Sequence, residues 1–193
     1  MSAASIPKLW TVEEYLADDR AAERPSEYHD GHVLPIENST WAHARIVATI
    51  SSQLVAGLRG GSCTGLSQIR VRISPTKFVY PDLVVVCGKP VFDDSYGDTI
   101  TNPKLIVEVL SRSTAGYDYG DKFLLYQRLP SFEEYVLVAQ DQPRVTVYRK
   151  TTERRWLMTV YEGLESTAKF ETIGVELALA NVYDGAFPEP PTP

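Results

Sequence analysis

Cysteine, long apolar runs and a leader-like N-terminus are scarce or missing in this chain of 193 residues. Its two cysteines, Cys63 and Cys87, have neither the spacing of metal ligands nor the number that a disulfide framework needs. No apolar run approaches the roughly 18 residues of a membrane span. The first ten residues, MSAASIPKLW, contain no apolar core of a signal peptide. These absences predict no membrane association and a reduced, cytoplasmic compartment.

The signatures of several large enzyme classes are missing as well. The chain has no G-x-S-x-G, no phosphate-binding glycine loop and no dinucleotide-binding fingerprint. The sequence therefore gives no support to a serine hydrolase of that type, a P-loop enzyme or a nicotinamide-dependent oxidoreductase.

Positive charge is in deficit, with 19 Lys and Arg against 25 Asp and Glu and a net charge of -6. This balance argues against a general binder of polyanions. One stretch differs, because no acidic residue occurs between Glu37 and Asp82. It contains instead the basic residues Arg45, Arg59, Arg70, Arg72 and Lys77. Either these are scattered solvated side chains, or they form a basic face that could hold a phosphate backbone.

The remaining composition is that of an ordinary globular protein, with 44% hydrophobic and 23% charged residues. The length suits one domain with a sizeable core. We expect a single domain over residues 1–187, followed by a disordered proline-rich tail, PEPPTP, at 188–193.

Hydrophobic periodicity predicts the main elements. Helices are expected at 11–18, where Thr11 and Glu14 form a capping box, at 39–61, and at 119–130. A hairpin is expected around the turn Asp30-Gly31. Strands are expected at 63–74, 78–88, 104–111, 133–140, 144–150 and 155–163.

Two of these strands, LVVVC at 83–87 and LIVEVL at 105–110, are almost continuously apolar. Such runs are typical of strands that are covered on both faces. The sequence therefore predicts an α/β or α+β fold, in which a mixed sheet is flanked by helices and extended by antiparallel strands.

Three charged residues stand out against these apolar elements. Asp82 follows Pro81 at the head of one strand, Glu108 lies inside the next, and Lys122 lies in the helix that follows. One such carboxylate could belong to a structural ion pair. Two that converge repel each other unless a cation lies between them, and Mg²⁺ binds through one or two carboxylates. A nearby lysine would complete a site for phosphodiester cleavage.

The segments YPDLVVVCG at 80–88 and NPKLIVEVLSRSTAGYDYGDKFLLYQRLPSFEEYVLV at 102–138 carry a family resemblance. They resemble the Uma-type restriction endonucleases of the PD-(D/E)XK nuclease superfamily. The resemblance covers about residues 9 to 185 and includes SEYHDGHV near the start and the RVTVYRK strand. It implies a restriction-endonuclease-like fold and hydrolysis of DNA.

The resemblance also implies roles for individual residues. Asp82 and Glu108 would be ligands of Mg²⁺ or Mn²⁺. The superfamily usually places a lysine two residues after the second acid, where this chain has Leu110. In the Uma-type family the lysine has moved to the following helix, which implies a catalytic Lys122, and Asp118 matches a further acidic position.

Other positions match the family less completely. Glu27 matches the glutamate of the early motif and would add a catalytic carboxylate. His43 matches the histidine that opens the long helix. Arg112 lies in the SRST segment that follows the LIVEVL strand. It could bind phosphate or merely end that strand. The family's frequent aspartate after the EY motif is Ala139 here, with Asp141 close by.

The resemblance leads to one expected function and leaves two rivals open. We expect a metal-dependent DNA endonuclease, with a homodimer suggested by analogy to other nucleases. The first rival keeps the fold but only binds nucleic acid or protein. The second hydrolyses a small phosphoester. His29 and His32 flank the predicted turn as H-x-x-H, without the further ligands that zinc needs.

Overall fold

The computed structural model describes residues 8–111 and 115–187. Its elements are α1 (Val12–Ala21), β1 (Ser26–His29), β2 (His32–Pro35), α2 (Trp41–Gly57), β3 (Cys63–Ser67), β4 (Arg70–Ser74), β5 (Lys77–Val79), β6 (Leu83–Cys87), β7 (Thr99–Ile100), β8 (Leu105–Leu110), α3 (Ala115–Tyr117), the π-helix η1 (Asp118–Lys122), α4 (Phe123–Tyr126), β9 (Glu134–Ala139), β10 (Arg144–Thr152), β11 (Arg155–Glu162), β12 (Thr167–Phe170), β13 (Val175–Ala178) and α5 (Leu179–Val182). The predicted tail at 188–193 lies outside the described residues.

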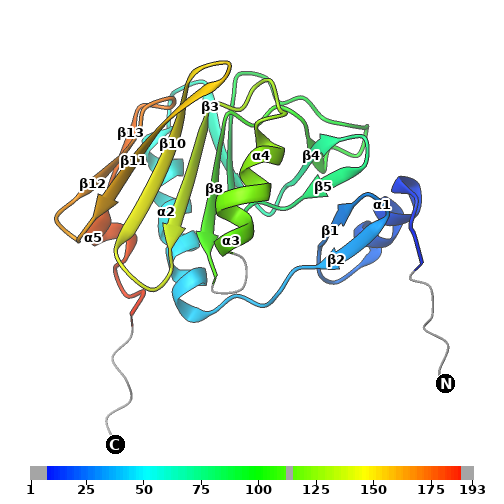
Figure 1. The fold of residues 1–193 in the computed structure, drawn as a ribbon, viewed down its shortest axis with the longest axis horizontal. Helices are drawn as coiled ribbons and strands as arrows, with labels where there is room; N and C mark the ends of the chain where they lie inside the picture. The colour runs from blue at the N-terminus through cyan, green and yellow to red at the C-terminus, as the bar shows by residue number, and fades with distance from the viewer. Residues whose placement is uncertain (1–7, 112–114, 188–193) are drawn as a thin grey trace, which may run out of the picture.

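A six-stranded mixed sheet forms the centre of the molecule (Figure 1). Its order is β11-β10-β9-β8-β6-β3, with β8 and β9 parallel and the other neighbours antiparallel. A second sheet, β2-β1-β5-β4-β7, lies on the N-terminal side, and β12 and β13 pair as a separate hairpin. The predicted α+β fold with a helix-flanked mixed sheet and added antiparallel strands is confirmed.

Both faces of the central sheet are covered, as the apolar runs predict. Leu105, Val107 and Val109 of β8 pack in one apolar cluster with α2, the β12–β13 hairpin and α5. Ile106 and Leu110 pack in the other cluster, which includes side chains of α4, β4 and β5. Because side chains alternate along a strand, the even-numbered positions of β8 face the α4 side.

Two predicted strands are each divided between the two sheets. The run 63–74 breaks at Gln68, which has a positive φ of 55°, between β3 of the central sheet and β4 of the second sheet. The run 78–88 breaks at Tyr80-Pro81, between β5 and β6. Proline cannot donate a ladder hydrogen bond, which favours the second break. These two crossings place the β1–β2 hairpin next to the start of β6.

Local signals for caps and turns agree with the structure. Thr11 and Glu14 form the predicted capping box of α1, and the Thr40 hydroxyl caps α2. Asp30 and Gly31 both have positive φ in the hairpin turn, as a type I′ turn requires. The predicted helix 119–130 begins earlier, at Ala115, and contains the π-helix η1. Within the described residues, no helix combines the length and the apolar character that crossing a membrane requires.

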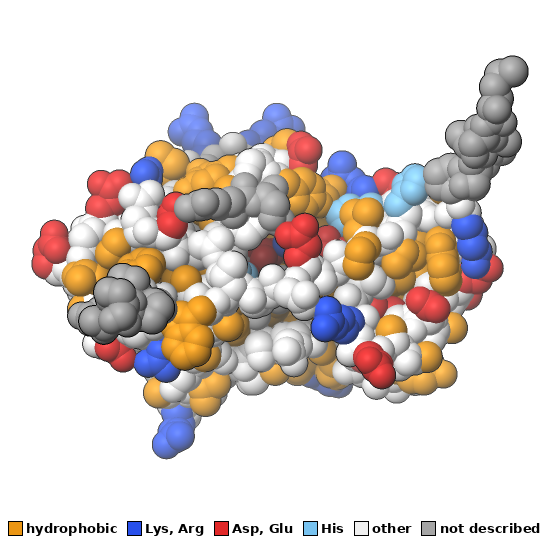
Figure 2. All heavy atoms as spheres, turned by 90° about the horizontal axis from the view of Figure 1, so that it is seen from below, with side chains coloured by type: hydrophobic (Ala, Val, Ile, Leu, Met, Phe, Trp, Pro, Cys, Tyr) orange, Lys and Arg blue, Asp and Glu red, His pale blue; other side chains and the backbone are white. Residues whose placement is uncertain are grey.

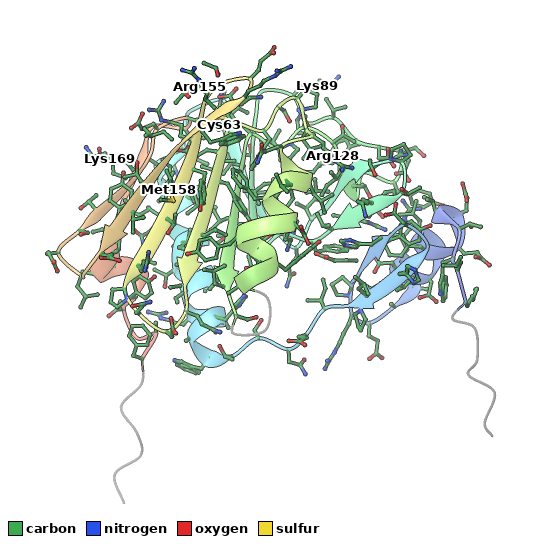
Figure 3. All side chains as sticks on the ribbon, in the orientation of Figure 1. Cys63, Lys89, Arg128, Arg155, Met158 and Lys169 are labelled. Atoms are coloured by element: carbon green, nitrogen blue, oxygen red, sulfur yellow. A yellow bond between two sulfur atoms is a disulfide. The ribbon has the colours of Figure 1, made fainter. Side chains whose placement is uncertain are left out.

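The expectation that the two cysteines form no disulfide framework is wrong. Cys63 and Cys87 form a disulfide, because the β3–β6 register sets them directly opposite each other. Their separation of 24 residues gives no sign of this pairing in the sequence. Figure 3 shows Cys63 at the end of the sheet away from α3. The disulfide removes the cysteine argument for a reduced compartment.

Replacing Cys63 by serine is expected to lower the free energy of unfolding by about 2–4 kcal/mol under oxidising conditions. The reason is that the crosslink restricts the unfolded chain. Urea unfolding of the wild type and Cys63→Ser, each with and without a thiol reductant, measures the effect. A difference between the two proteins that survives reduction would contradict this origin of the stabilisation.

Candidate active site

An open cavity of about 780 Å³ lies where β8 ends. Figure 2 looks onto this end of the molecule and shows a hollow near its centre with acidic side chains inside. The predicted site residues that line the cavity are Glu27, His43, Asp82, Glu108, Asp118 and Lys122. Arg112, the remaining predicted residue, lies outside the described residues. The fold therefore gathers side chains that come from five separate segments of the chain.

Asp82 and Glu108 lie together because of the register between β6 and β8. Leu83 pairs with Val107, so the next position in the same register sets Asp82 opposite Glu108. Asp82 also accepts a hydrogen bond of 2.7 Å from the backbone N–H of Val109. Both carboxylates line the same cavity, as the two-carboxylate interpretation requires.

Glu108 is deeply buried, with 4% of its surface exposed. Its Oε1 accepts a hydrogen bond of 2.7 Å from the Tyr126 hydroxyl and lies 2.8 Å from Nζ of Lys122. Burial raises the pKa of Glu108 to about 8, although Lys122 opposes this and the neighbouring carboxylates of Asp82 and Asp118 add to it. Sequence reasoning missed Tyr126, whose helical spacing of four residues from Lys122 is the signal that could have identified it.

Lys122 is a buried cation in the lining of the cavity. Besides the contact with Glu108, its Nζ lies 3.7 Å from Glu27 and 3.7 Å from Asp118, one turn earlier in the same element. Burial alone would lower the pKa of Lys122, but these three carboxylates outweigh it and raise the pKa above its ordinary value. Lys122 therefore lies beside the carboxylates of the cavity, as the interpretation of a lysine displaced to this helix requires.

Glu27 reaches the site from the second sheet. Its strand β1 pairs with β5, so its side chain lies where β5 leads into β6. It accepts a hydrogen bond of 3.2 Å from the backbone N–H of Tyr80 and lies 3.1 Å from Nε2 of His29. Burial would raise the pKa of Glu27, but Lys122 and His29 lower it below its ordinary value. Glu27 is therefore an ionised partner of Lys122.

His43 lines the site from α2. Its Nε2 lies 3.3 Å from Oδ2 of Asp82, and its buried Nδ1 has no hydrogen-bond partner within the described residues. Burial would lower the pKa of His43, but Asp82 raises it above its ordinary value. One turn earlier, the Thr40 hydroxyl donates a 2.6 Å hydrogen bond to Gln140, which joins the start of α2 to the segment after β9.

The donor set fits a hard divalent cation. Over residues 8–111 and 115–187, no three His, Cys, Asp or Glu side chains are arranged to hold a metal ion by themselves. Mg²⁺ does not need three, because one or two carboxylates complete its shell with waters and substrate oxygens. Lys122 pairs with Glu27, Glu108 and Asp118, and Asp82 lines the same cavity. A divalent cation between Asp82 and Glu108 would offset the surplus negative charge.

The stretch from 45 to 77 does not form the basic face considered above. Four of its five cations pair with carboxylates: Arg45 with Asp184, Arg70 with Asp19 and Asp98, Arg72 with Asp93, and Lys77 with Asp30. The buried Arg70 joins α1 to the second sheet, so these residues are structural or solvated.

Two positions depart from the usual motifs of these nucleases. Leu110 packs in an apolar cluster and offers no charge. Ala139 replaces the family's aspartate, but Asp141 lines the cavity.

Comparisons with known proteins show the family and the fold of this chain. Residues 12–180 match the model of the family Uma2, described as "Putative restriction endonuclease". Two uncharacterized proteins of Synechocystis sp., sll1609 and slr1290, are 33% and 32% identical to this chain. These matches cover 88% and 95% of this chain and 97% and 95% of the relatives. A crystal structure from Anabaena variabilis, described as "a putative nuclease belonging to DUF820", has a TM-score of 0.73 at 16% identity, over 92% of this chain and 99% of that one.

Proposed function

We propose that this chain, which belongs to the Uma2 family, is a metal-dependent endonuclease that hydrolyses phosphodiester bonds of DNA. One observation carries the proposal. The ammonium of Lys122 lies 2.8 Å from Glu108 inside a cavity that Asp82 also lines. A cation beside two convergent carboxylates is the arrangement that metal-assisted phosphoryl transfer needs.

Asp82 and Glu108 would hold Mg²⁺ or Mn²⁺. When bound, the ion supplies a Lewis acid for a phosphate oxygen and lowers the pKa of a bound water. Lys122 binds a non-bridging oxygen of the scissile phosphate and stabilises the negative charge that develops there. Its burial strengthens this effect, because charge interactions grow in a medium of low dielectric constant.

Glu27 and Asp118 are assigned to positioning. Each lies 3.7 Å from Nζ of Lys122, and both help to raise the pKa of this lysine. The His43 imidazole, beside Asp82, is placed to orient that carboxylate. A homodimer, expected by analogy to other nucleases, would bring one such cavity to each strand of a duplex.

A second candidate, hydrolysis of a small phosphodiester, is favoured by the charge of the cavity. Among the residues that the structure describes, its lining contains one lysine, no arginine and six acidic residues: Glu27, Glu37, Asp82, Glu108, Asp118 and Asp141. Such a lining offers a long polyanion little attraction away from Lys122.

Incubation of the purified protein with supercoiled plasmid separates these candidates. We expect nicked or linear plasmid with Mg²⁺ or Mn²⁺, no cleavage with EDTA, and none with Asp82→Asn. Bis(p-nitrophenyl) phosphate serves as the small substrate in a parallel assay. Cleavage of that compound without plasmid cleavage would favour the second candidate. Failure to cut either one, in a folded protein that binds metal, would favour a non-catalytic role.

A further inference from the structure

A second hollow, of about 180 Å³, adjoins the catalytic cavity. The two share Ser111, Gln140 and Asp141 in their linings, and the second continues to Tyr119 and Arg144. We propose that this hollow binds the nucleotide next to the scissile phosphate on an unpaired strand, and that Tyr119 stacks on its base while Arg144 binds its phosphate. The inference rests on the proposed nuclease function and adds the form of nucleic acid that the site accepts.

The path between the two hollows follows the chain itself. Ser111 comes directly after β8, three residues beyond Glu108, and borders both hollows. Tyr119 lies in η1, the element that carries Lys122. A strand whose phosphate contacts Lys122 therefore has a continuous hollow surface along which to leave the site.

Hydrogen bonds fix the backbone of Arg144, whereas the ion-pair partner of its guanidinium can be replaced by a ligand. The Tyr183 hydroxyl accepts a hydrogen bond of 3.0 Å from the backbone N–H of Arg144, and lies 2.7 Å from its carbonyl and 2.9 Å from that of Ala139. The guanidinium contacts the largely exposed Glu162 at 3.4 Å, and its Nε is buried without a hydrogen-bond partner among the residues described. Exposed ion pairs contribute little to stability. A phosphate, which suits the planar guanidinium well, can replace Glu162.

Tyr119 supplies an aromatic surface, with 40% of the residue exposed. A base inside a duplex is already stacked on its neighbours, so it cannot offer its face to a side chain. Proteins that bind single strands use such aromatic side chains as stacking platforms. The substrate is therefore unpaired at this position, as in a single strand, a frayed end or a flipped nucleotide.

Asp141 fixes where the phosphate can lie. Its carboxylate borders both hollows and would repel a phosphate placed at their junction. The phosphate contact therefore belongs at Arg144, beyond this carboxylate. Neutralising Asp141 should strengthen the binding of a strand along this path.

Fluorescence anisotropy with a labelled single-stranded oligonucleotide tests the proposal. The substitutions are introduced into the Asp82→Asn protein, which serves as the parent. They are also introduced into the wild type, which is then assayed in EDTA as a second parent. We expect Arg144→Gln to weaken binding about tenfold and to reduce the slope of log K against log salt by about 0.7. Tyr119→Ala should weaken binding about 5- to 100-fold, Tyr119→Phe should not, and Asp141→Asn should tighten it. The control is Arg149→Gln, because Arg149 lies on the same strand β10 and also pairs with a glutamate, Glu171, but lines neither hollow.

A duplex of the same sequence should bind less tightly and should be indifferent to Tyr119→Ala. The proposal is overturned if the parent binds no single strand, or if Arg144→Gln and Tyr119→Ala bind as the parent does. Neither result depends on catalysis. Failure of the nuclease function shows separately, as wild type that leaves both plasmid and single-stranded DNA intact in Mg²⁺.

Discussion

Replacing Lys122 by alanine is expected to slow DNA cleavage about 10²- to 10³-fold while the protein still binds metal. The change removes the cation that stabilises developing charge, and losses of this size follow removal of a single such donor in other enzymes. It leaves Asp82 and Glu108 in place, so divalent-metal affinity should be retained or increased. Single-turnover cleavage of a labelled oligonucleotide, together with calorimetric titration of Mn²⁺, measures both effects.

The matched control is Lys169→Ala. Lys169 lies on β12, pairs with Glu176 at 3.1 Å and is largely exposed (Figure 3). The Lys169→Ala protein should cleave DNA at the wild-type rate. Because Lys122→Ala leaves buried carboxylates without their partner, circular dichroism must first show that it is folded at the assay temperature. A folded Lys122→Ala protein that cuts as fast as wild type would reject the assigned role.

Replacing Glu108 by glutamine is expected to abolish most of the stabilisation that Mg²⁺ gives to the protein. A ligand that binds only the folded state stabilises it by about 2.7 kcal/mol at a concentration 100 times its Kd. The wild-type melting temperature should therefore rise with Mg²⁺, and that of Glu108→Gln much less. The substitution keeps an oxygen that can accept from Tyr126 but removes the carboxylate nearest to Lys122, so circular dichroism must first show that Glu108→Gln is folded without metal.

The control for this prediction is Glu176→Gln, an exposed residue of β13 whose partner is Lys169. Its melting temperature should rise with Mg²⁺ as much as that of the wild type. Equal rises in wild type and Glu108→Gln would mean that the stabilising ion binds elsewhere.

The local features of the fold could be predicted from the sequence because they depend on near neighbours. The Thr11 capping box, the Asp30-Gly31 turn and the apolar face of the long helix each act within a few residues. The apolar run 105–110 likewise indicated that Glu108 lies in a strand covered on both faces.

Features that depend on long-range pairing could not be predicted in this way. The left-handed conformation of Gln68 sends β3 and β4 into different sheets, and glutamine carries no signal for it. The pairing of Cys63 with Cys87 depends on the β3–β6 register.

Within the site, the family resemblance identified Glu27 as a candidate residue. Its contact with Lys122, however, depends on the pairing between β1 and β5. Two hydrogen bonds near the site were missed because they also depend on long-range contacts. The Tyr80 backbone N–H and the Thr40–Gln140 hydrogen bond each join segments more than 50 residues apart, so no local pattern reveals them.

A crystal structure of the protein soaked with Mn²⁺ tests the central claim most directly. The anomalous signal should locate one ion within about 2.0–2.6 Å of oxygens from both Asp82 and Glu108. Nζ of Lys122 should remain beside the same cavity. No ion at these carboxylates under saturating Mn²⁺, or an ion bound only elsewhere on the chain, would contradict the account.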